Sequence, residues 1–423
     1  MSLKPALLQP LPGCLLAALL AAAPAPPLAA LAAPLSPAAA PAVNAGGFDR
    51  RRYTPAILRL SFSGNRSAAG QPGQGSFLDL TLVPLSGEPI GRRVPVNTSA
   101  FAALLRSLYS QLSRQAPLEV DSPEAPARQL HQLLLHPLVP DLERLGVTTL
   151  LVAAEPGLQA VPLAALHDGS RYFGERYAFS LTPAIGLTPL ALPTTPPGAR
   201  SLAAGASRFE GLAPLPLVPQ ELARINQGSR VDRYLDRAFT PSVLLERLAD
   251  PLLNRVHVAT HAEFMPGGPS QARLFTGTEP FPLARFAQLR QRRSGQPLDL
   301  IVLSACRTAL GDRDSELGFA GLALQAGARS AIGTLWYVDD VATSAFFVQY
   351  YRYLERGMPK AEALQATRSA MARGAIRLQG RRVLGVEGQT LLDDLSSSQQ
   401  QRVADGLRHP FFWAGITMLG VPW

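Results

Sequence analysis

Beyond residue 120, short apolar runs alternate with segments whose apolar residues recur at helical spacing. Apolar runs of this length are typical of strands that are buried on both faces of a parallel sheet. The predicted strands cover residues 148–153, 201–206, 255–260, 298–304 and 329–335. We therefore predict an α/β fold with a doubly wound, mostly parallel sheet and helices on both of its faces.

Two of the intervening helices have clear start signals. Thr240 precedes Pro241, which predicts an N-cap and a first-turn proline for a helix over residues 242–249. Pro359 opens a second helical run that ends at residue 373. The sequence has no internal repeat with a period of about 20 to 50 residues, so we do not expect an array of tetratricopeptide repeats or another solenoid.

Residues 48–118 have a different pattern. Two β-rich pieces, 57–62 and 77–83, are separated by Gly, Ser and Pro turns, and residues 101–115 then show helical spacing. A polar connector that contains proline follows at 119–128. This pattern predicts a small α+β N-terminal region, with a domain boundary near residue 120.

The first 45 residues are rich in Leu, Ala and Pro and contain one charged residue, Lys4. An apolar stretch at 14–23 precedes a proline-rich segment, and small-residue sites follow at 40–42 and 43–45. This order suits a secretory signal peptide better than a membrane span, which needs about 20 apolar residues. We expect a periplasmic or secreted protein without a transmembrane span if the leader is cleaved, and a cytoplasmic protein if it is not.

The net charge of +9 raises the question of nucleic-acid binding. Of the 40 basic residues, only Lys4 and Lys360 are lysines, and the arginines are scattered along the chain. The densest groups, at 50–52 and 290–293, are short and have no interleaved aromatic residues, unlike a strand-binding surface. We interpret the arginines as solvated surface residues and expect no nucleic-acid partner.

Cysteine is nearly absent, because Cys14 and Cys306 are the only two in 423 residues. A single pair excludes a disulfide framework, a zinc ribbon and an iron–sulfur cluster. If the leader is removed, Cys306 remains as the one thiol of the chain. Its role is then either that of a buried apolar residue, which is common for free cysteine, or that of a nucleophile.

The position of Cys306 favours the nucleophile. Cys306 follows the predicted strand 298–304, and His261 follows the predicted strand 255–260. Loops at the carboxyl ends of neighbouring parallel strands meet at one edge of a sheet, so we expect the two side chains to lie close together. An imidazole beside a thiol accepts its proton or stabilises the thiolate, which predicts acyl transfer with backbone amides around Cys306 and after His261 holding the oxyanion.

His257 and His261 are four residues apart, a spacing that occurs in metal sites. On a helix this spacing places two histidines on one face, but residues 256–260 are predicted to be a strand, and the glutamate of H-E-x-x-H is absent. We interpret His257 as a core or edge residue and expect neither a metal nor a cofactor. The sequence also has no G-x-S-x-G elbow, Walker loop or dinucleotide fingerprint.

Five further segments carry motifs in a fixed order. They are VHVATHAEF (256–264), LSACRTALG (303–311), ELGFAGLALQAGARS (316–330), GTLWYVDD (333–340) and HPFFWAG (409–415). Together they resemble the bacterial CHAT domain, a family in the caspase and separase clan of cysteine peptidases, and LQAVPLAAL (158–166) resembles its early strand and turn. The resemblance covers residues 120–423 and implies a caspase-like fold and a cysteine endopeptidase activity.

The resemblance also implies roles for single residues. Cys306 matches the nucleophile, and His261 matches its base or ion-pair partner. The backbone N–H of Ala262 would contribute to the oxyanion hole, although the family usually has glycine at this position, and the alanine methyl group restricts the backbone. A catalytically inactive caspase-fold protein-interaction module is therefore the alternative to a peptidase.

Asp339 and Asp340 match the loop that, in this clan, often lines the pocket for the residue before the scissile bond. Acidic residues there imply a preference for Arg or Lys through charge pairing. Asp339 has an alternative role as the cap of a helix that contains residues 343–353. The expected partners are a protein or peptide substrate and, for a latent peptidase, an activating protein.

Overall fold

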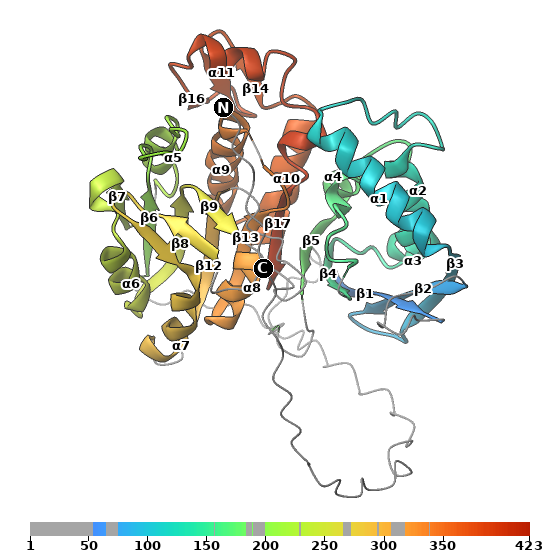
Figure 1. The fold of residues 1–423 in the computed structure, drawn as a ribbon. Helices are drawn as coiled ribbons and strands as arrows, with labels where there is room; N and C mark the ends of the chain where they lie inside the picture. The colour runs from blue at the N-terminus through green and yellow to red at the C-terminus, as the bar shows by residue number, and fades with distance from the viewer. Residues whose placement is uncertain are drawn as a thin grey trace, which may run out of the picture. The chain divides into compact units, whose positions relative to one another are not determined.

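The computed structural model describes residues 54–64, 75–155, 157–182, 188, 199–227, 230–264, 272–293, 296–305, 318–337 and 339–423 (Figure 1). These residues belong to one compact unit, Val43–Trp423. The predicted leader and Cys306 lie outside the described residues. Within the described ranges, no helix is both long enough and apolar enough to cross a membrane.

Eleven strands form one sheet in the described part of the chain (Figure 1). In spatial order they are β3 (Ile90–Val96), β2 (Ser76–Pro84), β1 (Pro55–Ser63), β4 (Thr149–Ala154), β5 (Ala178–Leu181), β17 (Ile416–Gly420), β13 (Ala328–Thr334), β12 (Leu298–Ser304), β8 (Leu253–Ala259), β6 (Arg200–Gly205) and β7 (Val231–Leu235). The run from β13 to β7 is parallel, and β17 is antiparallel to β13. The mostly parallel sheet flanked by helices confirms the predicted fold class.

The predicted strands beyond residue 120 correspond to β4, β6, β8, β12 and β13, and their ends agree within two residues. The agreement has a simple physical cause. All residues of β12 are buried, and β8 and β13 are buried at nearly every position. A strand that is covered on both faces has to be apolar throughout, which is why these runs stand out in the sequence.

The lead-in strands extend the same sheet. Strand β1 pairs in parallel with β4, with Ile57 opposite Leu151, and pairs on its other side with antiparallel β2. The helices α1 (Thr98–Ser113), α2 (Pro126–Leu134) and α3 (Val139–Arg144) follow. The sheet is thus continuous between the N-terminal region and the later strands, and the boundary near residue 120 stays a prediction.

Further helices follow in the later part of the chain. They are α4 (Phe173–Arg176), α5 (Val218–Arg224), α6 (Pro241–Ala249), α7 (Leu289–Arg292), α8 (Gly318–Gln325), α9 (Asp340–Glu355), α10 (Lys360–Ala372) and α11 (Ser397–Arg402). The predicted cap of α6 is confirmed, because the Val243 N–H donates to the Thr240 hydroxyl at 3.2 Å. Helix α9 is buried around most of its circumference, as expected for a helix inside the core.

Two small sheets complete the fold. One contains β9 (Ala262–Phe264), β10 (Ala272–Phe275) and β11 (Pro280–Pro282), and begins directly after His261. The other contains β14 (Arg377–Gln379), β15 (Arg382–Leu384) and β16 (Thr390–Leu392). This second sheet and α11 lie together beyond one end of α9 (Figure 1).

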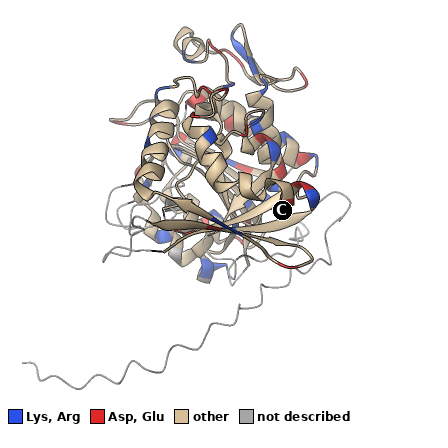
Figure 2. Ribbon diagram, turned by 90° about the vertical axis from the view of Figure 1, so that its right-hand side faces the viewer, with Lys and Arg blue, Asp and Glu red and all other residues tan. Residues whose placement is uncertain are grey.

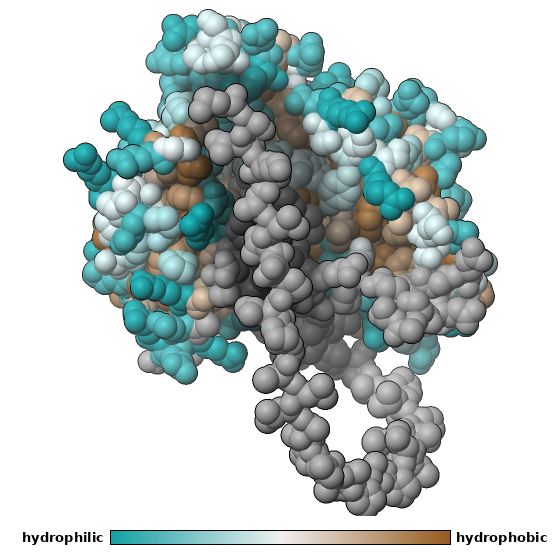
Figure 3. All heavy atoms as spheres, viewed as in Figure 1, coloured by the Kyte–Doolittle hydropathy of each residue, from teal (hydrophilic) through white to brown (hydrophobic). Residues whose placement is uncertain are grey.

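Charged residues are spread over the described surface. Figure 2 shows Lys and Arg interspersed with Asp and Glu on the helices of that view. In the view of Figure 3, hydrophilic side chains dominate the margins at the left and the top, over β7, α6 and α11. On the face drawn in Figure 2, Lys and Arg do not form one continuous basic stripe.

The buried His131 of α2 predicts a pH-dependent stability. The side chain is 5% exposed, and burial lowers its pKa from 6.5 to about 4. The unfolded chain binds a proton at His131 below about pH 6.5, whereas the folded chain resists protonation down to about pH 4. We predict that this residue lowers the free energy of unfolding by up to about 3 kcal/mol as the pH falls through that window.

Urea unfolding of the native chain and His131→Gln at pH 7 and pH 4.5 measures this contribution. The variant should lose less stability on acidification than the native chain. The matched control is His136→Gln, because His136 is exposed and lies in the next turn. Equal acid sensitivity of the native chain and His131→Gln would contradict the prediction.

Candidate active site

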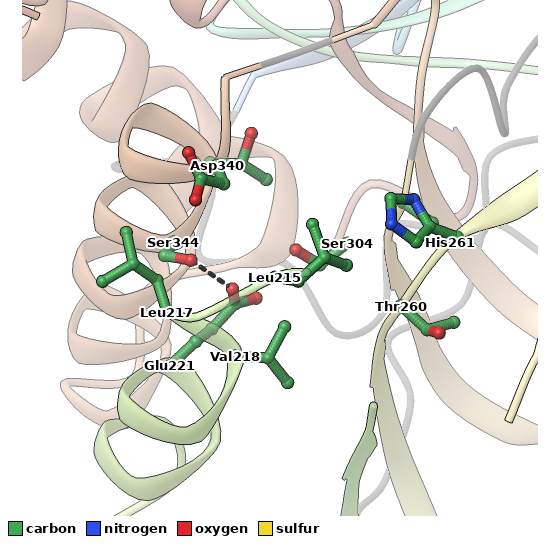
Figure 4. Close-up of a pocket in the computed structure, with 11 residues that line it drawn as sticks. Leu215, Leu217, Val218, Glu221, Thr260, His261, Ser304, Asp340 and Ser344 are labelled. Carbon is green, nitrogen blue, oxygen red and sulfur yellow. Dashed lines mark hydrogen bonds between the residues drawn. The ribbon is translucent and has the colours of Figure 1, made fainter. Parts of the chain in front are cut away.

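The candidate site lies where β6, β8 and β12 end. Strands β8 and β12 are parallel neighbours, with Ala259 opposite Ser304, which confirms the strand adjacency expected from the sequence. The residues that follow these strands line one cavity of about 50 Å³ (Figure 4). His261 and Thr260 come from the end of β8, and Ser304 and Ala305 come from the end of β12. Ala305 precedes Cys306 in the sequence, and Cys306 itself lies outside the described residues.

A backbone carbonyl orients the His261 ring. The Nε2 atom of His261 lies 2.8 Å from the carbonyl oxygen of Ala213. A carbonyl oxygen only accepts hydrogen bonds, so Nε2 carries a proton and donates it, and in the neutral ring the lone pair is on Nδ1. The Phe209 ring packs against the imidazole with a centroid distance of 4.7 Å. His261 therefore has a fixed tautomer that is suited to a proton acceptor.

Sequence reasoning missed the loop that supplies these contacts. Residues 206–217 connect β6 to α5 and provide Phe209 and Ala213 to the imidazole, and Leu215 and Leu217 to the cavity wall. One signal was available, because this loop follows the predicted strand 201–206 just as His261 and Cys306 follow their strands. Loops at the carboxyl ends of parallel strands converge on one site.

The backbone at Ala262 suits an alanine. Ala262 is the first residue of β9, where the chain is extended, and it is not among the described residues with positive φ. The Phe275 N–H donates to the His261 carbonyl oxygen at 3.0 Å. Hydrogen-bonded and non-bonded pairs alternate in an antiparallel ladder, so the Ala262–Leu274 pair is non-bonded, and the Ala262 N–H points away from β10.

The two predicted pocket acids take different positions. Asp339 caps α9, because its Oδ1 accepts hydrogen bonds from the N–H groups of Val341 at 2.9 Å and Ala342 at 3.2 Å. Asp340 lines the cavity, whereas Asp339 does not. The capping alternative for Asp339 is therefore present in the structure.

Arg402 of α11 pairs with both acids. Its Nε lies 2.6 Å from Asp339 Oδ2, and its Nη2 contacts Asp340 Oδ1. Burial raises the pKa of Asp340, and the neighbouring Asp339 charge adds to this shift, while Arg402 opposes it. Asp340 at the outer side of the cavity and Asp339 next to it thus share one guanidinium.

A buried polar cluster on the inner side of the cavity was not predicted. Glu221 of α5 lines the cavity, and its Oε1 lies 2.7 Å from Nε2 of His257. The Ser344 hydroxyl of α9 donates to Glu221 Oε2 at 2.6 Å (Figure 4). His257 is fully buried, in agreement with its interpretation as a core residue. Across the described ranges, no cluster of three or more His, Cys, Asp or Glu could hold a metal ion.

The CHAT domain model matches residues 124–421, which is more than half of the chain. The chain therefore belongs to the CHAT domain family. Among curated proteins, no sequence matches it significantly.

Solved structures that this chain resembles include two peptidases. Gingipain R, an Arg-specific cysteine proteinase, has a TM-score of 0.44 and 11% identity, and the match covers 77% of this chain and 75% of gingipain R. The complex of the pro- and mature domains of this proteinase from Porphyromonas gingivalis has a TM-score of 0.42 and 12% identity, and the match covers 77% of each chain. The separase of Saccharomyces cerevisiae in complex with securin has a TM-score of 0.47 and 9% identity, and the match covers 88% of this chain and 30% of the other chain.

The cap of α9 can be tested by mutation. We predict that Asp339→Ala lowers the free energy of unfolding by about 1 kcal/mol, because the Ala342 N–H of α9 loses its acceptor and the Val341 N–H keeps only Asp340 Oδ1, at 3.0 Å. Asp339→Asn keeps an accepting oxygen and should have a smaller effect in urea unfolding. Equal losses in the two variants would show that the ion pair with Arg402, and not the cap, is what matters at this position.

Proposed function

We propose that this chain is a caspase-like cysteine endopeptidase in which Cys306 is the nucleophile and His261 is its base or ion-pair partner. One observation carries the proposal. The oriented imidazole of His261 and Ala305, the residue before Cys306, line the same cavity at the ends of two paired parallel strands. This placement supports acyl transfer between a thiol and an imidazole.

In the proposed reaction, Nδ1 of His261 accepts the thiol proton, and the sulfur attacks the peptide carbonyl carbon. The carbon–nitrogen bond then breaks, the imidazolium gives its proton to the leaving amine, and a thioester remains. Water attacks the thioester with His261 as base, which releases the carboxylic acid and restores the thiol. The Ala262 N–H, directed away from β10, is the proposed donor to the oxyanion, a contact typically worth about 3 to 4 kcal/mol.

We propose that the substrate is cut after Arg or Lys. Asp340 lines the cavity that also contains His261, and Asp339 is its neighbour. Both carboxylates already bind the guanidinium of Arg402. A pair of acids that holds an internal arginine is chemically suited to hold the arginine of a substrate.

The same ion pair supports a latent state. While Arg402 neutralises Asp339 and Asp340, an incoming cationic side chain has to compete with it. Arg402 ends α11, which follows the small sheet β14–β15–β16. We propose that a protein partner, or cleavage of the enzyme's own loops, moves this segment and activates the peptidase.

A second candidate is a catalytically inactive protein-interaction module with the same fold. The pairing of Arg402 with both acids favours it, as does the alanine at position 262 where the family usually has glycine. Such a module would bind a protein without cleaving it. The nucleophile test separates this candidate from the peptidase.

We predict that Cys306→Ala abolishes the cleavage of Arg- and Lys-containing peptides, with a loss of at least about a thousandfold in kcat. The thiol is the only group that forms the proposed thioester, so the remaining residues give only background hydrolysis. Turnover is measured with fluorogenic peptides, with Cys14→Ala as the matched control. Undiminished cleavage by Cys306→Ala would exclude Cys306 as the nucleophile, and no cleavage by the native chain even after activation would favour the interaction module.

We predict that Arg402→Gln raises kcat/KM for Arg-containing peptides by about two- to fivefold, which is the range expected for losing a partly exposed ion pair. Without Arg402, the substrate guanidinium no longer competes with an internal one. The control is Arg381→Gln, because Arg381 is an exposed arginine from the same segment that pairs weakly with Asp394. A decrease in kcat/KM for Arg402→Gln alone would show that Arg402 supports the site instead of blocking it.

A further inference from the structure

We infer that Glu221, which lies on the inner wall of the cavity, is the acid that selects a cationic side chain in this pocket. The inference rests on the proposed function only in treating the cavity as the substrate pocket. Glu221 belongs to none of the motifs found in the sequence. The selection of a cationic side chain is thus assigned to Glu221 of α5 in addition to the loop that contains Asp340.

Glu221 is placed to meet a group that enters the cavity. It is 1% exposed, and it lines the cavity together with His261, Ser304 and Ala305. Figure 4 shows its side chain extending from α5 toward Ser344 on α9, with His261 on the opposite side. Among the described residues that line the cavity, Glu221 and Asp340 are the acidic ones.

Two hydrogen bonds fix the Glu221 carboxylate and leave part of it free. His257 Nε2 and the Ser344 hydroxyl each contact one carboxylate oxygen. A carboxylate has about four acceptor sites, so about two remain for a ligand. The arrangement presents oxygen atoms to the cavity in a fixed orientation, which lowers the entropy lost when a cation binds.

His257 does not cancel the charge of Glu221. Its ring is packed between Phe347 and Tyr351, with centroid distances of 5.3 and 5.4 Å. The Nδ1 atom is buried without a hydrogen-bond partner among the described residues. A protonated ring would leave a buried N–H donor unsatisfied there, so the neutral ring with its proton on Nε2 fits the contacts. A neutral donor orients the carboxylate and leaves its negative charge to be paired.

The remaining walls fit the stem of a basic side chain. Leu215 and Leu217 from the loop after β6 and Val218 from the start of α5 also line the cavity. A volume of about 50 Å³ holds about four water-sized groups, which is the size of the end of a side chain. Lysine and arginine combine an apolar stem with a cationic tip, and this cavity combines apolar walls with an inner acid.

Binding of N-butylguanidine and N-butylurea to the full chain tests the inference without requiring peptide cleavage. The two probes have the same shape, but only the guanidine is charged. Isothermal titration of the native chain should give an affinity for butylguanidine that is at least about tenfold higher than for butylurea. In Glu221→Gln the affinity for butylguanidine should fall about ten- to a hundredfold, as for a lost hydrogen bond to a charged group, while butylurea binding changes little.

A control variant isolates Glu221. Glu210→Gln removes one negative charge from the exposed part of the same loop after β6. It should keep the preference for butylguanidine. Equal binding of the two probes by the native chain, or an unchanged preference in Glu221→Gln, would overturn the inference.

If Glu221→Gln does not fold, Glu221→Asp provides the test. It keeps the charge and shortens the side chain by one methylene, so affinity for butylguanidine should fall at least about threefold as the contact lengthens. An unchanged affinity in this variant would also overturn the inference.

Peptides with arginine or citrulline before the scissile bond then link the pocket to catalysis. Glu221→Gln should reduce the arginine-to-citrulline ratio of kcat/KM, which a merely structural role would not change. Guanidine binding through Glu221 without peptide cleavage, even after activation, would refute the proposed peptidase and leave this inference intact. Cleavage by the native chain that does not distinguish arginine from citrulline would support the proposed peptidase and overturn the inferred selection of a cationic side chain.

Discussion

The parallel pairing of β8 with β12 is the constraint on which the rest of the site depends. All residues of β12 are buried, and the register places Ser304 opposite Ala259. This register brings the ends of both strands to one edge of the sheet, where the next residues of the chain line a common cavity. Because neighbouring residues of a strand point to opposite faces, a slip by one residue would move each side chain of β12 to the other buried face, where it would not fit the close packing, so the packing of the core maintains the geometry.

Strand β6 adds the third part of the site through the same rule. It pairs in parallel with β8, so its loop reaches the same edge and supplies the Ala213 carbonyl to His261. Helix α5 then returns along the sheet and carries Glu221 to the cavity and to His257 in β8. The segment from the end of β6 through α5 thus orients the His261 imidazole and supplies Glu221 to the inner wall of the cavity. The tautomer of His261 and the position of Glu221 are both consequences of where β6 ends.

Sequence patterns predict the parts of this fold that are dictated by local burial. The five main strands are continuous apolar runs, and Thr240 and Pro241 predict the start of α6 correctly. Strands β5 and β17 are only four and five residues long and were missed, because runs of this length carry little periodic signal. The contacts of Glu221 with His257 and Ser344 span 36 and 123 residues of sequence. No local pattern encodes such contacts, and the same holds for Arg402 and Asp339, which are 63 residues apart.

The carboxylates in and beside the cavity differ in how easily another cation can displace their present partner. Arg402 is 45% exposed, so water and salt screen its pairing with Asp339 and Asp340, and another cation can replace it. Glu221 is buried, and its partners are a neutral hydroxyl and an imidazole, so its charge acts at close range in a poorly screened environment. The proposed latency thus depends on Arg402 with Asp339 and Asp340, and the inferred selection of a cationic side chain depends on Glu221. The two functions reside on separate elements, α11 and α5, and hydrogen bonds of Gln220 and Arg224 with Leu391 and Asp393 join α5 to the segment before α11.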